Sequence, residues 1–178
     1  KQVQEELVDY QGNGLSMMET SHRGGMFEEM YDETIALFKD LIGAGEEYEF
    51  YFLGGGATLQ FSMIPINFLP PGGTAGYINS GSWSEKALKD ARKLGQVEVV
   101  WDGKESNYTT LPKMETLAID PKLSYLYLCS NETIGGIEYK EFPASGPVPL
   151  VADMSSDILS RPFDINRFGM VFGGVQKN

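Results

Sequence analysis

A glycine-rich segment lies between an apolar run and a stretch with helical periodicity. It runs from Gly54 to Thr58 and reads Gly-Gly-Gly-Ala-Thr, so that Ala57 and Thr58 open the helical stretch. Small residues let backbone N–H groups approach an anion, and a helix N-terminus adds partial positive charge. The segment therefore predicts a phosphate site, with a plain glycine turn as the alternative. It is neither a Walker A loop nor a dinucleotide fingerprint, which removes support for nucleoside triphosphates and NAD.

Two further residues follow expected strands. Trp83 comes after the run 75–79 and just before an expected helix. Its indole can stack on a flat heteroaromatic ring, or it can simply fill the core. Thr133 follows the run 125–129 and offers a hydroxyl at the same edge.

Asp153 closes the apolar run Val-Pro-Leu-Val-Ala. A carboxylate at the end of a buried strand is costly to keep charged unless it meets a cation or hydrogen-bond donors. A protonated ring nitrogen would meet that need, and a helix cap is the alternative interpretation.

Lys177 follows Asp153 at a distance that accommodates one crossover between parallel strands, so both side chains can reach one sheet edge. A desolvated lysine forms Schiff bases with carbonyl compounds, whereas a lysine beside a chain end is more often a solvated charge.

His22 and Arg23 form the basic pair of an acidic N-terminal segment. Arginine binds phosphate or carboxylate in a bidentate manner, which makes the pair a candidate anion clamp. A surface pair neutralised by Glu28 and Glu29 is the alternative. A single histidine without cysteine or histidine neighbours predicts no metal site.

The stretches between these residues predict alternating strands and helices. Helical periodicity or composition covers about 2–9, 25–42, 58–68, 84–94 and 164–168. Short β-rich runs cover 48–53, 75–79, 97–100, 125–129, 150–153 and 170–172. This order predicts an α/β fold of three layers, α/β/α, with a mostly parallel sheet and a single domain over residues 1–178. Ligands of such sheets bind beyond the carboxyl ends of the strands.

Composition excludes several classes of protein. The net charge is −11, with 14 Lys and Arg against 25 Asp and Glu, which argues against nucleic acid and anionic membranes as partners. No apolar run approaches the about 18–20 residues of a membrane span. The single cysteine, Cys129, lies in an apolar context that predicts a buried thiol in a reducing compartment, and we expect a cytoplasmic protein.

A phosphate loop, a stacking tryptophan, an aspartate for a ring nitrogen and a lysine at one sheet edge together match the needs of pyridoxal 5'-phosphate. Each signal is weak alone, and their joint presence predicts this cofactor.

Several segments also resemble the phosphoserine aminotransferases, which are class-V, fold-type-I pyridoxal-phosphate enzymes. The similarity covers nearly the whole chain, and its Asp-Met-Ser-Ser and Gln-Lys-Asn blocks are the most specific. The matching segments are Ser21-His-Arg, Gly55-Gly-Ala-Thr-Leu-Gln-Phe-Ser, Gly81-Ser-Trp-Ser, Ser130-Asn-Glu-Thr-Ile-Gly, Val151-Ala-Asp-Met-Ser-Ser-Asp-Ile-Leu-Ser-Arg-Pro and Gly173-Gly-Val-Gln-Lys-Asn.

The resemblance implies roles around the ring of the cofactor. Lys177 would be the catalytic lysine, which binds pyridoxal phosphate as a Schiff base and shuttles the α-proton of the substrate. Asp153 would pair with the pyridinium nitrogen and Trp83 would stack on the ring. Thr133 would form a hydrogen bond near the phenolic oxygen.

The resemblance also implies two phosphate contacts. Ala57 and Thr58 would offer backbone N–H groups to the cofactor phosphate, with Gln176 as a side-chain donor. His22 and Arg23 match the motif that helps to bind the phosphate of the substrate.

The implied reaction is transamination between 3-phosphohydroxypyruvate and L-glutamate, which gives O-phospho-L-serine and 2-oxoglutarate in serine biosynthesis. Members of the family are homodimers that share cofactor-phosphate ligands between subunits. They also have a short N-terminal opening and a C-terminal half with a small domain. We therefore expect residues 1–178 to be an incomplete large domain that is poorly active alone.

Two alternatives remain open at this point. One is a related pyridoxal-phosphate aminotransferase that acts on alanine or glyoxylate. The other is a non-catalytic fragment that keeps the pyridoxal-phosphate fold.

Overall fold

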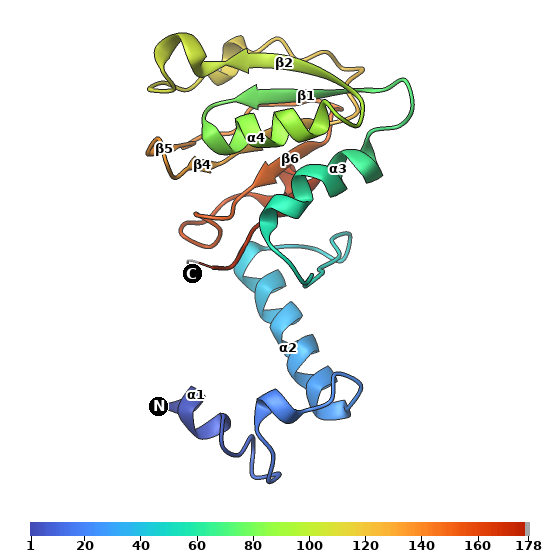
Figure 1. Cartoon of the computed structure of the whole chain (residues 1–178), viewed down its shortest axis with the longest axis vertical. Coiled ribbons are helices and arrows are strands. Elements are labelled where there is room, and N and C mark those ends of the chain that lie inside the picture. Colours follow the sequence, from blue (N-terminus) through green and yellow to red (C-terminus); the bar gives the residue numbers. More distant parts are fainter. Residues whose placement is uncertain (177–178) are drawn as a thin grey trace. The chain divides into compact units, whose positions relative to one another are not determined.

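The computed structural model describes residues 1–176 (Figure 1). The chain forms two compact units, Lys1–Tyr51 and the residues from Phe52 onward. Every helix in the described part of the chain is too short or too polar to cross a membrane.

The first unit contains α1 (Gln2–Glu6), a short 3-10 helix η1 (Met17–Glu19) and α2 (Gly25–Ile42). The helix predicted over 25–42 is confirmed to the residue, and it ends at Gly43, whose φ of 67° suits glycine. The helix predicted over 2–9 stops earlier, at Glu6. Turns follow it, and Asp9 Oδ1 then accepts a hydrogen bond from the backbone of Gly14 at 2.8 Å.

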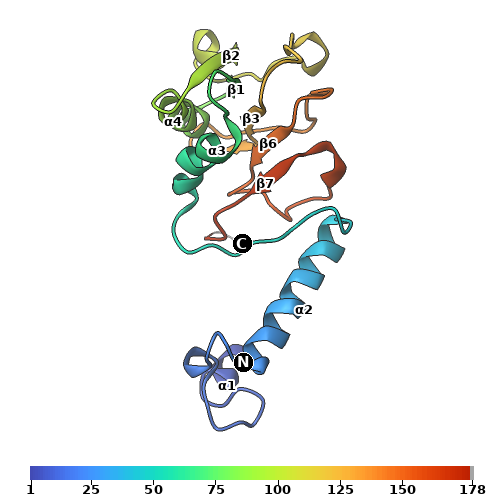
Figure 2. The ribbon, with the colours of Figure 1, turned by 90° about the vertical axis from the view of Figure 1, so that its right-hand side faces the viewer.

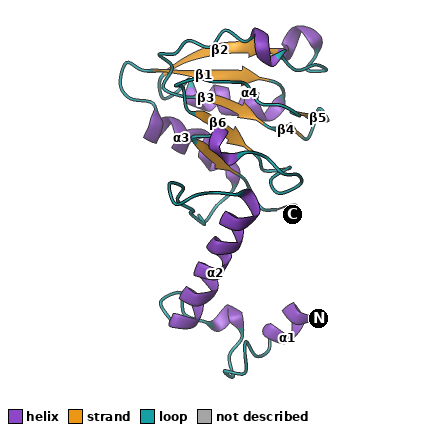
Figure 3. Cartoon of the chain, turned by 180° about the vertical axis from the view of Figure 1, so that it is seen from behind, coloured by secondary structure: helices purple, strands orange, loops and turns teal. Residues whose placement is uncertain are grey.

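The second unit is built on a five-stranded parallel sheet with the order β2-β1-β3-β6-β7 (Figure 3). The strands are β1 (Thr74–Asn79), β2 (Gln96–Asp102), β3 (Leu126–Cys129), β6 (Leu150–Asp153) and β7 (Met170–Phe172). β3 and β6 are buried along their whole length, which is why their sequences are continuous apolar runs. The five strands predicted for these regions are confirmed.

One face of the sheet carries the 3-10 helix η2 (Ala57–Leu59), α3 (Gln60–Phe68) and α4 (Ser82–Ala91) (Figure 2). Aromatic rings fill the space between these helices and the strands. Tyr77 stacks on Tyr127 with ring centroids 4.9 Å apart, and Phe61 meets Tyr127 edge-on. The helices expected near 58–68 and 84–94 are thus present.

The other face is covered by loops and 3-10 turns in the described part of this unit. They include η3 (Gly103–Ser106), η4 (Met114–Thr116) and η5 (Ile165–Arg167). The two-stranded hairpin of β4 (Asn131–Glu132) and β5 (Ile137–Glu138) follows β3 and contacts the first turn of α4. The loops and 3-10 turns over the other face bury a second core around Ile78, Leu128 and Phe168. The α/β class with a parallel sheet is confirmed, whereas the α-helices of this unit lie on one face of the sheet.

The strand predicted over 48–53 is wrong for the described structure. Residues 48–53 are irregular, and Tyr51 and Leu53 are 69% and 58% exposed. Their alternating aromatic and aliphatic pattern suits a pleated surface, but a strand exists only when its N–H and C=O groups meet a neighbouring strand. No strand among residues 1–176 pairs with this segment.

The second core lies on the face of the sheet opposite α3 and α4, which we call the far face. Shortening a side chain in this core is expected to lower the stability of the protein strongly. We expect Leu126→Ala, at a fully buried position, to lower the free energy of unfolding of the full-length protein by about 2–5 kcal/mol, measured in denaturant. Leu94→Ala, at a position 47% exposed, is the control and should change it by less than about 0.5 kcal/mol. Equal effects of the two variants would contradict the burial described here.

Candidate active site

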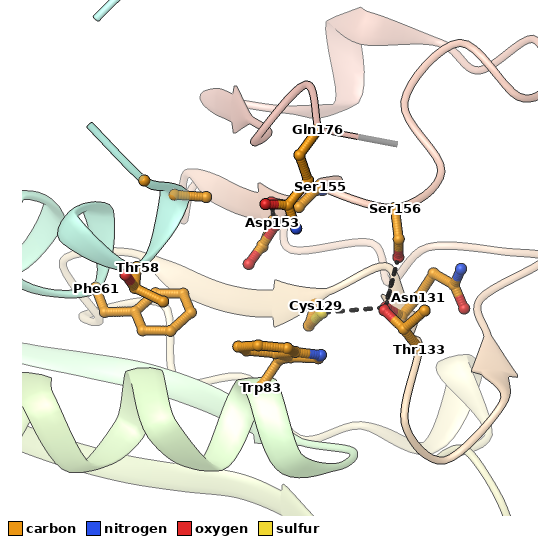
Figure 4. A pocket seen from close by; sticks show the side chains of 12 residues that line it. Thr58, Phe61, Trp83, Cys129, Asn131, Thr133, Asp153, Ser155, Ser156 and Gln176 are labelled. Atoms are coloured by element: carbon orange, nitrogen blue, oxygen red, sulfur yellow. Dashed lines mark hydrogen bonds between the residues drawn. The ribbon is translucent and has the colours of Figure 1, made fainter. Parts of the chain in front are cut away.

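A cavity of about 160 Å³ opens beyond the carboxyl ends of β3 and β6 (Figure 4). This is the edge at which ligands of parallel sheets bind. Six residues that the sequence singled out line it: Ala57, Thr58, Trp83, Thr133, Asp153 and Gln176. Gly56, Phe61, Cys129, Asn131, Ser155 and Ser156 complete the lining. The fold thus brings together residues that are more than 100 positions apart in the chain.

Asp153 lies at the end of β6, between β3 and β7, and is 4% exposed. Its Oδ1 accepts hydrogen bonds from the backbone N–H of Ser155 at 2.9 Å and from its hydroxyl at 2.6 Å. Its Oδ2 has no hydrogen bond within residues 1–176. Burial raises the pKa of this carboxyl group, and the nearby Glu132 and Asp157 raise it further, against the effect of Ser155. A carboxylate in this setting is stabilised by a cationic or donating group in the cavity.

The backbone of Asp153 is held by a second set of contacts. Its carbonyl oxygen accepts hydrogen bonds from the N–H of Ser130 at 2.9 Å and from the Ser130 hydroxyl at 3.0 Å. The same hydroxyl contacts the buried carboxylate of Asp157. Burial raises the pKa of Asp157 as well, while its hydrogen bond with Ser130 and the charge of Arg161 lower it. These contacts restrict the position of the Asp153 side chain.

Ser155 links Asp153 to the segment after β7. Its hydroxyl donates to Asp153 Oδ1 and accepts a hydrogen bond from the backbone of Gly174 at 3.0 Å. A Cβ atom at Gly174 would lie only 3.1 Å from the Cβ of Ala57, so this segment passes close to the glycine-rich loop. The close approach explains how Gln176 reaches the cavity.

The glycine-rich loop presents a helix N-terminus to the cavity. Gly55 has a φ of 107°, a conformation that favours glycine, and the 3-10 helix begins two residues later at Ala57. No side chain caps this N-terminus among the described residues. The first N–H groups of a helix have no partner within the helix, so they can bind an anion.

Trp83 is the second residue of α4 and is half-buried against the aromatic core. Figure 4 shows its ring seen nearly edge-on, with Asp153 beyond one face of the ring. Lys86 Nζ lies 4.2 Å from the centroid of the indole. On another side of the cavity, the Thr133 hydroxyl contacts the Ser156 hydroxyl at 3.2 Å, and the latter donates to the carbonyl of Asn131 at 3.1 Å.

The roles of all the predicted site residues remain predictions, and three of these residues do not line the cavity as described. Lys177 lies outside the described residues. His22 and Arg23 belong to the first unit, where they are exposed just before α2. No group of three or more metal-ligating side chains comes together within residues 1–176.

Two residues at or beside the cavity, Ser155 and Glu132, were not predicted from the sequence. Ser155 follows Asp153 by two residues, a spacing typical of side-chain-to-backbone turns, and this signal could have been used. Glu132 is fully buried beside Thr133, and nothing in its local sequence distinguishes it from a surface acid. Cys129 was predicted to be a buried thiol, and this is confirmed, since it is 3% exposed and burial raises the pKa of its thiol.

The chain belongs to the class-V aminotransferase family, whose model matches residues 1–178. It is 50% identical to the phosphoserine aminotransferase of Niallia circulans and 47% identical to that of Bacillus cereus (strain ZK / E33L), over 178 residues in each case. The matches include 100% of this chain and 49% of each relative. The chain therefore spans about half the length of the curated relatives it matches.

Solved structures show the same similarity. The phosphoserine aminotransferase from Bacillus circulans subsp. alkalophilus is 50% identical, with a TM-score of 0.96 over 99% of this chain and 49% of that one. A phosphoserine aminotransferase with bound pyridoxal phosphate, from Trichomonas vaginalis, is 34% identical, with a TM-score of 0.89 over 99% of this chain and 50% of that one. The resemblance found in the sequence motifs is thus confirmed over the whole chain.

The buried Asp153 predicts a specific dependence of stability on pH. The pKa of Asp153 in the folded protein is raised above the ordinary value of about 3.9. Between these two pKa values the folded state therefore binds more protons than the unfolded state. The free energy of unfolding therefore falls as the pH rises through this range between the two pKa values. We expect Asp153→Asn to make the cofactor-free, full-length protein more stable at neutral pH but not below pH ~3.5, as measured by urea unfolding over a pH series.

Asp120→Asn, at an exposed aspartate that caps a turn through its Oδ1, is the matched control and should leave this pH dependence in place. If the Asp153 variant follows the pH profile of the wild type, the carboxylate does not carry the proposed cost of burial.

Proposed function

We propose that the protein containing these residues is a pyridoxal-phosphate-dependent aminotransferase. Its substrates in this proposal are 3-phosphohydroxypyruvate and L-glutamate, and its products are O-phospho-L-serine and 2-oxoglutarate. The observation that carries the proposal is the buried carboxylate of Asp153, whose Oδ2 has no hydrogen bond within residues 1–176, beside a cavity that also exposes Trp83 and a free helix N-terminus. Membership of the class-V family and the names of the relatives support the same reaction.

Each chemical group of this cofactor has a residue of matching chemistry in the cavity. Asp153 accepts a hydrogen bond from a protonated ring nitrogen, which offsets the cost of its burial. Trp83 packs against a flat ring, and the Thr133 hydroxyl donates to a phenolate oxygen. The N–H groups of Ala57 and Thr58, with the Gln176 amide, bind a phosphate. When bound, the cofactor supplies an electron sink for the negative charge that develops at the substrate α-carbon.

The remaining roles rest on the family resemblance. Lys177 Nζ attaches the cofactor and carries the proton of the substrate α-carbon. His22 and Arg23 bind the phosphate of the substrate, and the arginine guanidinium suits a bidentate contact with phosphate oxygens. This pair favours a phosphorylated substrate over alanine or glyoxylate.

We further propose a cytoplasmic homodimer. The free, buried thiol of Cys129 is consistent with a reducing compartment. The exposed apolar side chains of Leu59, Ile66 and Phe68, on η2 and α3, are 52%, 64% and 51% exposed and offer surface for a subunit interface.

The role of Lys177 is tested by chemical trapping in the full-length protein. After incubation with pyridoxal phosphate and reduction with borohydride, we expect stoichiometric label on Lys177 in peptide mass spectra. Lys177→Ala should lose the label and at least about 10²–10⁴-fold in transamination rate, because both attachment and proton transfer are lost. Lys122→Ala, at an exposed lysine, should retain both. Label scattered over surface lysines, or full activity of Lys177→Ala, would refute the assignment.

The role of Arg23 is tested by comparing the two half-reactions. Loss of a charge-assisted hydrogen bond predicts that Arg23→Ala lowers kcat/KM for phosphoserine by about 10–100-fold, while the half-reaction with glutamate changes little. Arg92→Ala removes an exposed arginine at the end of α4 and should affect neither. A wild-type preference for alanine over phosphoserine would favour the alternative substrate class, and an equal loss in both half-reactions would contradict a phosphate contact at Arg23.

A further inference from the structure

Glu132 is a fully buried acid next to the cavity, yet it does not line it. Both of its carboxylate oxygens are hydrogen-bonded to the first turn of α4. Oε2 accepts the backbone N–H of Trp83 at 2.8 Å. Oε1 accepts the backbone N–H of Ser84 at 2.8 Å and the Ser84 hydroxyl at 2.7 Å. A single side chain thus binds three donors from a helix about 50 residues earlier in the chain.

The contact takes the place of a local helix cap. The residue before α4 is Gly81, which has no side chain to accept the free N–H groups of the first turn. A Cβ atom at Gly81 would lie 2.6–2.7 Å from the side-chain atoms of Glu132, so glycine leaves the space that the carboxylate occupies. A negative charge at a helix N-terminus is also favoured by the helix dipole.

The same contact connects two walls of the cavity. Trp83 forms one wall and donates its own N–H to Glu132, and Thr133, which directly follows Glu132, forms another. The hairpin that carries Glu132 is itself fixed, since the Glu132 carbonyl accepts the N–H of Gly136 and the Ser130 carbonyl accepts the N–H of Tyr139, each at 2.8 Å. A displacement of α4 from this hairpin would change the distance between the indole and the Thr133 hydroxyl.

We propose that Glu132 is a positioning residue: its buried carboxylate holds the Trp83 ring and the Thr133 hydroxyl at the separation that the cofactor ring requires. The inference rests on the proposed function, because it uses the contacts of Trp83 and Thr133 with pyridoxal phosphate. In this proposal Glu132 touches neither cofactor nor substrate, and it acts through Trp83 and Thr133, which form two walls of the cavity.

Glu132→Gln is the central variant, since glutamine keeps the shape of the side chain. Its amide oxygen can accept from one backbone N–H, but its NH₂ group then faces the other donor, and the negative charge is lost. In the cofactor-free, full-length protein we expect the Trp83 and Ser84 amides to exchange hydrogen at least about tenfold faster. We expect the Kd for pyridoxal phosphate to rise about tenfold and the circular dichroism of the bound cofactor to weaken.

Two controls separate positioning from stability. Glu98→Gln makes the same chemical change at an exposed position of β2 and should leave exchange, Kd and dichroism unchanged. Val148→Ala truncates a buried side chain of the far-face core and should lower the melting temperature without changing the cofactor Kd. In a Trp83→Ala background, Glu132→Gln should raise the Kd clearly less than in the wild type, because the ring it positions is gone.

The outcomes are distinct. If the wild-type protein binds no pyridoxal phosphate, the proposed function fails and this inference with it. If the wild type binds it and Glu132→Gln binds equally well, or if Val148→Ala shifts the Kd as much, the positioning role alone is refuted. Should Glu132→Gln not fold, Ser84→Ala keeps both backbone contacts of Glu132 and removes the hydroxyl contact, together with the acceptor of the Ser80 and Gly81 N–H groups. The proposal then requires a smaller Kd increase, of about threefold, in the folded variant.

Discussion

The site depends on one constraint, which is the burial of a carboxylate at the end of a central strand. Asp153 is 4% exposed, Ser155 donates two hydrogen bonds to its carboxylate, and the Ser130 N–H and hydroxyl donate to its backbone carbonyl. These contacts satisfy Oδ1 and leave Oδ2 for a ligand. The negative charge, disfavoured by burial and by two neighbouring carboxylates, selects a ligand with a positive or donating group.

The other walls of the cavity are arranged around this carboxylate by contacts that are distant in sequence. Ser155 joins β6 to the segment after β7, and Glu132 joins the hairpin to α4. A parallel sheet makes this possible, since it aligns the carboxyl ends of strands whose sequences are far apart. Rigidity at these junctions matters because a flat cofactor ring tolerates little change in the spacing of the groups that hold it.

Residues 48–53 show that a strand-like sequence pattern does not by itself predict strand pairing. Their pattern is as strand-like as that of β3, but β3 lies between β1 and β6, whereas residues 48–53 pair with no strand within residues 1–176. β propensity describes how well a side chain fits a pleated, half-buried surface, so it cannot supply the missing edge. The long helix α2 matches its prediction because the hydrogen bonds of a helix join residues four positions apart and need no other segment of the chain.

The sequence by itself determined the residue types that can do the chemistry, the order of the strands along the chain and the family to which the chain belongs. Buried apolar runs and turn residues carry that information locally, and so do the motifs around Asp153 and Thr133. Tertiary structure alone decided that Glu132 is a buried helix cap and that the hydroxyl of Ser155 joins Asp153 at the end of β6 to the segment after β7. An acid or a serine looks the same in sequence whether it faces solvent or a partner about 20 to 50 residues away, because its role depends on the donors that folding brings to it.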